Sequence, residues 1–137
     1  MNILFLCKYN RFRSKVAEAI FKSLNKNFYN LKNYKIKSAG IILDKERLYV
    51  ADSVHRILGE KGIKIENEKP QKVDKRLIDW ADKIVIVAND VDLNEFPKNK
   101  LEVWKVEDVH ESDTEKIRMI ISEIEKRVTE FIRNLNL

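Results

Sequence analysis

Short apolar runs alternate along the chain with longer segments in which apolar residues recur every three or four positions. A short apolar run bounded by polar residues is typical of a strand, and a run that is apolar throughout is typical of a strand buried on both faces. Residues 83–88, Lys-Ile-Val-Ile-Val-Ala, are the strongest case of the second kind. The pattern therefore predicts four strands, at residues 2–6, 34–38, 83–88 and 101–106.

The segments with helical spacing predict helices between and after these strands. The first helix would bury Val16, Ala17, Ile20, Leu24 and Phe28. The second would end near Gly59 or Gly62 and bury Leu48, Ala51, Val54, Ile57 and Leu58. Asp74 is placed to cap a short helix that runs to Trp80. Ser112-Asp113-Thr114-Glu115 has the form of a capping box. It opens a long last helix with the buried face Ile117, Ile120, Ile121, Ile124, Val128, Phe131 and Leu135.

Strands that alternate with helices predict an α/β fold, an open four-stranded parallel sheet that is doubly wound, with helices on both faces. We expect residues 1–137 to form a single domain, since a chain of this length is typical of one. In such sheets, ligands bind beyond the carboxyl ends of the strands. Cys7 ends the first predicted strand and Asp108 follows the last, so both residues can line the same crevice.

Composition limits the classes of protein and partner. Hydrophobic residues make up 44% of the chain and charged residues 36%, which is typical of a globular protein. The net charge is +5, but 22 acidic residues are mixed among 27 basic ones and no basic patch interleaved with aromatic residues is visible. We therefore expect no nucleic-acid partner, and the basic balance favours an enzyme for anionic substrates.

The expected environment is cytoplasmic. No apolar run approaches the 18 residues of a membrane span, and no signal-peptide pattern is visible at the N-terminus. The one cysteine, Cys7, cannot form an internal disulfide, which suits a reducing compartment. We therefore expect no membrane partner, while the oligomeric state is left open.

The segment Cys7-Lys8-Tyr9-Asn10-Arg11-Phe12-Arg13-Ser14 carries the candidate chemistry. A lone cysteine at a strand end is usually a small core residue. Here it stands between a strand and a helix, where unpaired N–H groups and the helix dipole favour negative charge. Arg13 can hold two phosphate oxygens at once, and the same field favours the nucleophilic thiolate. Ser14 can donate to the sulfur, and Asn10 either ties the loop together or is an ordinary turn residue.

The pattern Cys-x-x-Asn-x-x-Arg-Ser after a hydrophobic strand resembles the low-molecular-weight protein tyrosine phosphatase family. The resemblance continues through Ser38-Ala39-Gly40, Gly62-Ile63 and the segment from Trp80 to Val87. It implies a phosphomonoester hydrolase that uses neither a metal nor a cofactor. Cys7 would be the nucleophile, and Arg13 would stabilise the phosphoryl group. The substrate-binding loop would consist of Lys8, Tyr9, Asn10, Arg11, Phe12 and Ser14.

The cysteine route also requires a general acid for the leaving oxygen. The resemblance assigns this role to Asp108, although Val109 stands where the family usually has proline and the neighbouring aromatic residues are missing. A solvated acidic loop is the plainer interpretation of this segment, and Glu107 is the fallback acid. Asp90 also follows a central strand, where a turn or helix cap is its expected role.

Other departures from the family pattern concern the pocket. Phe12 occupies the position of a second cysteine found in many members, so Cys7 lacks a neighbouring cysteine that would protect it from oxidation. Lys8, Tyr9 and Arg11 add charge and bulk at the pocket mouth, and Tyr49 is either a wall for an aromatic substrate or a packing residue. Two histidines and one cysteine predict no metal site.

Several functions are compatible with this motif. The leading one is hydrolysis of phosphotyrosine in proteins, with small aryl or sugar phosphates and phosphoarginine as other substrates. An arsenate reductase would need an external thiol, because Cys7 is the one cysteine. A phosphocarrier would keep its phosphate and would not need Arg13. A non-catalytic binder of phosphorylated ligands or nucleic acid would show affinity without turnover.

Overall fold

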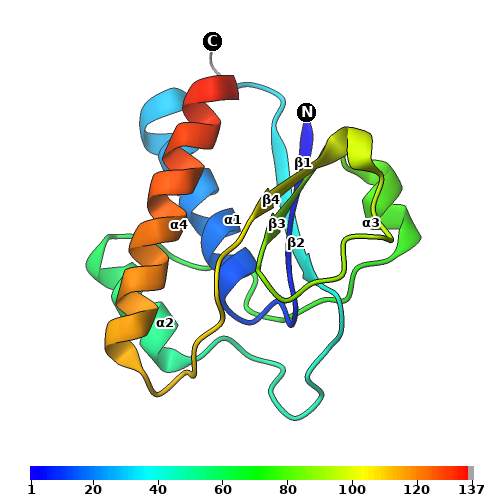
Figure 1. The fold of residues 1–137 in the computed structure, drawn as a ribbon. Helices are drawn as coiled ribbons and strands as arrows, with labels where there is room; N and C mark the ends of the chain where they lie inside the picture. Colours follow the sequence, from blue (N-terminus) through cyan, green and yellow to red (C-terminus); the bar gives the residue numbers. More distant parts are fainter. Residues whose placement is uncertain (136–137) are drawn as a thin grey trace.

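Four parallel strands form one sheet at the centre of the molecule (Figure 1). The computed structural model describes residues 1–135. The strands lie in the order β2-β1-β3-β4. Their bounds are β1 Asn2–Cys7, β2 Lys35–Gly40, β3 Lys83–Val87 and β4 Leu101–Trp104. The predicted four-stranded parallel sheet is confirmed, with strand bounds that differ by one or two residues.

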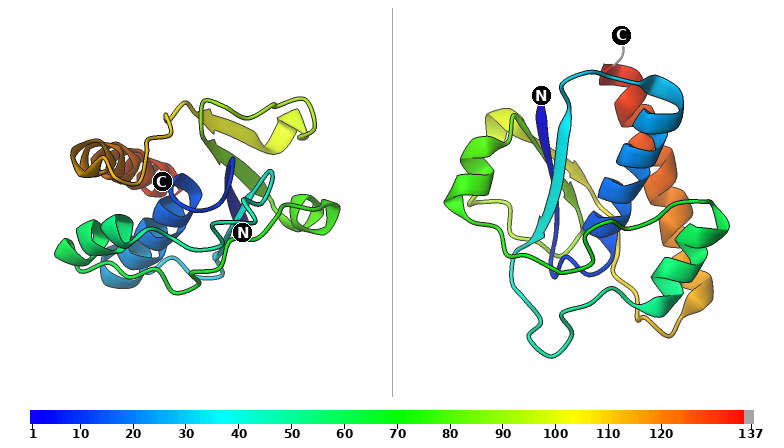
Figure 2. Two further views of the ribbon diagram at one scale, coloured as in Figure 1. Left: turned by 90° about the horizontal axis from the view of Figure 1, so that it is seen from below. Right: turned by 180° about the vertical axis from the view of Figure 1, so that it is seen from behind.

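Helices cover both faces of the sheet, as a doubly wound fold requires (Figure 2). Three helices lie on one face and α3 lies on the other. Their bounds are α1 Arg13–Leu24, α2 Asp52–Glu60, α3 Lys75–Trp80 and α4 Thr114–Leu135. A short 3-10 helix, Lys98–Lys100, precedes β4. Among the described residues, no helix is both long and apolar enough to cross a membrane.

The side chains of β1 divide the core into two parts. Ile3 and Phe5 point toward α1, α2 and α4, whereas Leu4 and Leu6 point toward α3. All four side chains are fully buried, because β1 lies between β2 and β3 and is covered on both faces. This explains why β1 and β3 read as continuous apolar runs in the sequence.

An aromatic cluster fills the larger part of the core. The ring of Phe5 lies 5.9 Å from Trp104 and 6.2 Å from both Phe21 and Phe131, measured between centroids. Trp104 and Phe131 meet edge to face at 5.8 Å. Tilted and edge-to-face pairs at these distances add attraction beyond the burial of apolar area. The cluster therefore fixes α1 and α4 against the sheet.

The predicted buried position of Phe28 is wrong. The chain leaves the α-helical path after Leu24 and forms a wider π turn, Asn25–Tyr29, that ends at Asn30 with a φ of 52°. The wider turn changes the angular spacing of the side chains, and Phe28 is 73% exposed. The three- and four-residue spacing in the sequence therefore predicts one helical turn more than α1 has.

Two predicted helix starts also differ from the structure. The second helix begins at Asp52, so Leu48 lies in the preceding loop and is exposed. The last helix is capped by Asp113, whose Oδ1 accepts a hydrogen bond from the N–H of Lys116 at 3.2 Å. Ser112 is not the cap, because its hydroxyl is paired with Nδ1 of His110 at 2.7 Å.

Strand register places the candidate chemistry at one edge of the sheet. Cys7 lies beside Gly40 in the β1–β2 ladder, and Val87 lies beside Trp104 in the β3–β4 ladder. Since the strands are parallel, their carboxyl ends meet at this edge, and the loops that follow β1, β2, β3 and β4 surround it.

Gly40 lets the loop after β1 pass close to the end of β2. A Cβ atom at this position would lie 2.8 Å from the backbone N of Asn10 and from the backbone C of Tyr9. It would lie 3.0 Å from the carbonyl oxygen of Lys8. Glycine is needed here because backbone, which cannot move aside cheaply, occupies the space.

We expect Phe131→Ala to lower the free energy of unfolding by about 3–5 kcal/mol, because it empties the centre of the aromatic cluster. Phe28→Ala is the matched control, and it should change the stability by less than about 0.5 kcal/mol. Urea denaturation followed by circular dichroism measures both values. Equal losses in the two variants would contradict the exposed position of Phe28.

We expect Gly40→Ala to destabilise the protein by about 1–3 kcal/mol, because the new methyl group displaces backbone in the loop after β1. At Gly59, near the end of α2, a methyl group would have no atom within 4 Å beyond its chain neighbours and the backbone of the helix itself. Gly59→Ala should therefore leave stability unchanged or raise it by up to about 1 kcal/mol. The same denaturation measurement would refute the close approach if Gly40→Ala were as stable as Gly59→Ala.

Candidate active site

The sulfur of Cys7 lies at the base of a loop that connects β1 to α1. Its side chain is almost fully buried, and Sγ lies 3.0 Å from Oγ of Ser14. Oγ of Ser14 already accepts a hydrogen bond from Nδ2 of Asn10 at 2.8 Å, so its own hydrogen is free to point toward the sulfur. A donor in this position stabilises a thiolate, which is the nucleophilic form of cysteine.

Asn10 combines the two roles that the sequence left open. Its φ of 55° places it in the left-handed region, where asparagine is tolerated in turns. Its side chain also ties the loop to its surroundings: Nδ2 donates to Ser14 and to Oγ of Ser38 at 3.0 Å. Oδ1 accepts from the N–H of Gln71 at 3.0 Å. The loop is therefore held by a fully buried amide.

A second support of the loop, Lys15, was missed by the sequence reasoning. Its side chain is 1% exposed, and Nζ donates to the carbonyl oxygens of Asn67 at 2.6 Å and Lys69 at 3.1 Å. Burial lowers the pKa of this ammonium group, because the charged form loses solvation. Lys15 therefore anchors the segment that precedes Gln71. Nothing in the sequence around Lys15 predicts these long-range hydrogen bonds.

Arg13 is buried to 1% exposure and is held by oxygen atoms from two other segments. Nη1 donates to Oδ1 of Asp90 at 3.0 Å and to the carbonyl oxygen of Val106 at 2.9 Å. Nη2 donates to Oδ2 of Asp90 at 3.4 Å. The expected role of Asp90 as a turn or cap residue is therefore wrong, since its carboxylate orients the guanidinium. Its position after a central strand was the one feature of the sequence that could have placed Asp90 near Arg13.

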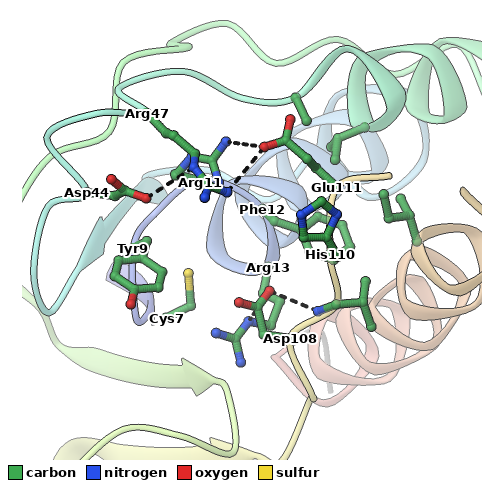
Figure 3. A pocket seen from close by; sticks show the side chains of 14 residues that line it. Cys7, Tyr9, Arg11, Phe12, Arg13, Asp44, Arg47, Asp108, His110 and Glu111 are labelled. Carbon is green, nitrogen blue, oxygen red and sulfur yellow. Dashed lines mark hydrogen bonds and ion pairs between the residues drawn. The ribbon is translucent and has the colours of Figure 1, made fainter. Parts of the chain in front are cut away.

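Asp108 faces the same pocket as Cys7 and Arg13 (Figure 3). Its Oδ1 lies 3.9 Å from Nε of Arg13 and accepts a hydrogen bond from the N–H of Val109 at 3.0 Å. Glu107, the fallback acid, is exposed and does not line the pocket. Val109, in the position of the expected proline, packs partly against the core.

The pocket has a volume of about 360 Å³. Six of the predicted site residues line it: Cys7, Tyr9, Arg11, Phe12, Arg13 and Asp108. The other three lie around it, since Asn10 and Ser14 are fully buried behind the sulfur and Lys8 lies over the ring of Tyr9 at 5.2 Å. Tyr49 does not line the pocket, and its exposed ring packs under the guanidinium of Arg11 at 5.0 Å.

Charged side chains from three loops surround the mouth of the pocket (Figure 3). Arg11 comes from the loop after β1, Asp44 and Arg47 from the loop after β2, and Glu111 from the loop that carries Asp108. Sequence reasoning identified the charge of Arg11 but missed its partners Tyr49 and Glu111, because these are 38 and 100 residues away along the chain. His110 also lines the pocket, with Nδ1 turned toward Ser112.

This arrangement can bind and attack a tetrahedral oxyanion. Within residues 1–135, the backbone N–H groups of residues 9–14 donate no hydrogen bond to another group of the protein. They lie at the start of α1, where the helix dipole also favours an anion. In the same described part of the chain, no group of three or more His, Cys, Asp or Glu side chains is arranged to hold a metal ion.

Comparison with known proteins agrees with this geometry. Residues 2–137 match the model of the family described as low molecular weight phosphotyrosine protein phosphatase. An arsenate reductase from Archaeoglobus fulgidus is 33% identical, with 95% of this chain and 98% of that one covered and a TM-score of 0.77.

Two phosphatase structures are more distant in sequence but similar in fold. A low molecular weight protein tyrosine phosphatase from T. tengcongensis is 22% identical, with coverage of 98% and 99% and a TM-score of 0.84. The YwlE arginine phosphatase from Geobacillus stearothermophilus is 23% identical, with coverage of 98% and 92% and a TM-score of 0.82. With the family model matched over nearly its whole length, this chain belongs to the low molecular weight phosphotyrosine protein phosphatase family.

Proposed function

We propose that this protein hydrolyses phosphomonoesters through a cysteinyl-phosphate intermediate, without a metal or cofactor, and that phosphotyrosine is its expected substrate class. One observation carries the proposal: Cys7, Arg13 and Asp108 line one pocket, and the hydroxyl of Ser14 lies 3.0 Å from the sulfur. Nucleophile, phosphate ligand and proton donor are thereby within reach of one substrate.

In the first step, the sulfur of Cys7 attacks phosphorus in line with the ester oxygen. An S–P bond forms and the P–O ester bond breaks. Asp108, in its protonated form, gives a proton to the leaving oxygen. The backbone N–H groups of the loop and Arg13 meet the charge on the three remaining oxygens, and such preorganised donors supply the largest part of the rate enhancement.

In the second step, water attacks the same phosphorus atom. Asp108, now a carboxylate, takes a proton from the water, and the S–P bond breaks. Inorganic phosphate leaves, and the sulfur returns as thiolate, stabilised again by Ser14. The cycle is closed, because each group ends in the protonation state in which it began.

The walls of the pocket support an aromatic leaving group. Tyr9, Phe12 and Val109 provide apolar surface on the way to the sulfur. Small aryl phosphates, sugar phosphates and phosphoarginine are alternatives within the same mechanism.

We also propose that the reaction takes place in the cytoplasm, because its nucleophile is a free thiol.

Arsenate reduction is the second candidate, favoured by the 33% identity to the Archaeoglobus fulgidus enzyme. Cys7 is the one cysteine of this chain, so the reaction would require an external thiol to reduce the oxidised sulfur. Assaying purified protein for arsenate reduction with glutathione, beside hydrolysis of a panel of phosphorylated substrates, separates the two functions. Reduction without hydrolysis would replace the proposed function.

We expect Cys7→Ser to abolish turnover of an aryl phosphate, because the S–P intermediate cannot form. Asp108→Asn should lower kcat by about 10²–10⁴-fold, since it cannot give a proton to the leaving oxygen. The loss should be larger for phenyl phosphate than for 4-nitrophenyl phosphate, whose leaving group needs no proton. Steady-state assays with both esters, in EDTA, measure these effects.

Glu107→Gln is the matched control for Asp108→Asn, because Glu107 is exposed and lies outside the pocket. It should leave both rates within about twofold of the wild type. A wild-type rate in Asp108→Asn together with a large loss in Glu107→Gln would transfer the role of acid to Glu107. Turnover that survives Cys7→Ser, or that requires magnesium, would refute the mechanism.

We expect Asp90→Asn to lower kcat/KM by about 10- to 100-fold, because the guanidinium of Arg13 loses its charged partner and its fixed orientation. Vanadate inhibition should weaken in parallel, since vanadate mimics the phosphoryl oxygens that Arg13 contacts. The control is Asp92→Asn, an exposed carboxylate nearby whose Oδ1 accepts from the N–H of Asn94. Equal kinetics in the two variants would show that Asp90 does not position Arg13.

A further inference from the structure

The charged side chains at the mouth of the pocket form a connected cluster that the proposed chemistry does not use. We define this mouth cluster as Arg11, Asp44, Arg47 and Glu111. Oε1 of Glu111 lies 3.3 Å from Nη2 of Arg11 and 3.5 Å from Nη1 of Arg47. Oδ2 of Asp44 lies 3.7 Å from Nε of Arg47. Two guanidinium groups therefore share one carboxylate oxygen beside the entrance.

Both arginines have a partner other than Glu111. Nε of Arg11 donates to the carbonyl oxygen of Tyr49 at 3.1 Å, and its guanidinium lies 5.0 Å from the centre of the Tyr49 ring. Arg47 has one charged contact besides Glu111, since its Nε lies 3.7 Å from Oδ2 of Asp44. If the side chain of Glu111 moved away, each guanidinium group would keep one partner of its own, and the remaining side chains of the mouth cluster would carry a net positive charge.

Glu111 binds this pair weakly. Its contacts of 3.3 and 3.5 Å are longer than the about 2.7–2.9 Å of good charge-assisted hydrogen bonds. Oε1 of Glu111 contacts both guanidinium groups, although each guanidinium could donate to two oxygens of a partner of its own. The backbone of Glu111 is fixed separately, because its carbonyl oxygen accepts from Oγ of Ser53 at 2.9 Å. The carboxylate can therefore rotate away without unfolding the loop that carries Asp108.

We propose that Arg11 and Arg47 form a subsite for a second anionic group of the substrate, and that Glu111 is the internal carboxylate which this group displaces. The substrate class is then a phosphomonoester that carries another carboxylate or phosphate group near the scissile phosphate. This inference rests on the proposed function, since it places the scissile phosphate at Cys7.

Charge explains how the subsite selects among substrates. A substrate without a second charge leaves Glu111 bound to the two arginines, and its own binding is not strengthened by them. In a substrate with a second anionic group, that group takes the place of the Glu111 carboxylate. It can then hydrogen-bond to both guanidinium groups at shorter distance. Arg47 is 46% exposed, so an incoming anion can reach it from solvent. The net charge of +5 favours the approach of such substrates.

The test compares two substrates that differ in one charge: 3-carboxyphenyl phosphate and its neutral isostere, 3-carbamoylphenyl phosphate. We expect the wild type to prefer the carboxylate by about five- to tenfold in kcat/KM. Arg47→Met should reduce this ratio to near one, because it removes one fork. Glu111→Gln should raise the ratio above that of the wild type, because it removes the competing charge.

Lys45→Ala is the matched control for Arg47→Met. Lys45 is an exposed cation of the same loop, and the ion pairs of Glu111 within residues 1–135 are with Arg11 and Arg47. Its removal takes away one positive charge and should leave the ratio unchanged, which separates the subsite from general electrostatic steering. Equal losses of the ratio in Lys45→Ala and Arg47→Met would overturn the proposal.

Two other results would also overturn it. A ratio of one in the wild type means that the arginines do not recognise a second anion. An equal loss of kcat on both substrates in Glu111→Gln, with the ratio unchanged, means that Glu111 is a strut that positions the loop of Asp108.

Failure of the proposed function is read separately, by calorimetry on the Cys7→Ser protein. The probes are 3-carboxybenzylphosphonate and its carbamoyl isostere, which bind without turnover. Tighter binding of the carboxylate supports the subsite even if no ester is hydrolysed, and equal binding of the two probes rules the subsite out.

Phosphotyrosine peptides with a neighbouring Glu or Gln then identify the source of the anion. A Glu preference indicates an acidic protein segment, and its absence beside a preference for the small carboxylate indicates a small substrate.

Discussion

The buried guanidinium of Arg13 is the constraint on which the site depends. A charge with 1% exposure is stable in a protein only when oxygen atoms surround it. Asp90 supplies two of these atoms and the carbonyl of Val106 supplies a third. These partners come from the segments after β3 and β4, so one side chain at the start of α1 joins three parts of the chain.

The same requirement explains why the chemistry gathers at one edge of the sheet. Parallel strands in the order β2-β1-β3-β4 end at a common edge, where Cys7 is the last residue of β1, and Asp90 and Asp108 follow β3 and β4. Behind them, Asn10 connects the loop of Cys7 to Ser14, Ser38 and Gln71. Cys7, the proposed nucleophile, is therefore placed by the buried backbone of β1 and by a satisfied polar network, which is the kind of support that fixes a site to a fraction of an ångström.

The sequence predicted what is local and missed what depends on distant partners. The strands and the loop from Cys7 to Ser14 were predictable, because apolar runs and the spacing of Cys7, Arg13 and Ser14 are properties of neighbouring residues. The role of Asp90 was not, since a carboxylate after a strand can equally cap a turn. Lys15 gave no signal, because its two carbonyl partners lie more than 50 residues away. Phe28 was misplaced because the π turn changes the spacing that the pattern assumes.

The proposed reaction and the proposed choice of substrate depend on different parts of the structure. Cys7 and Arg13 are almost fully buried at the junction of β1 and α1, so a substitution at either position changes contacts in the interior of the protein. Arg47 and Glu111 stand on loops, are partly exposed and have long contacts. A substitution there alters the charge at the entrance without removing a buried partner. Under the proposed function, substitutions at the mouth cluster can therefore change substrate selectivity in this protein while the buried groups at Cys7 stay as they are.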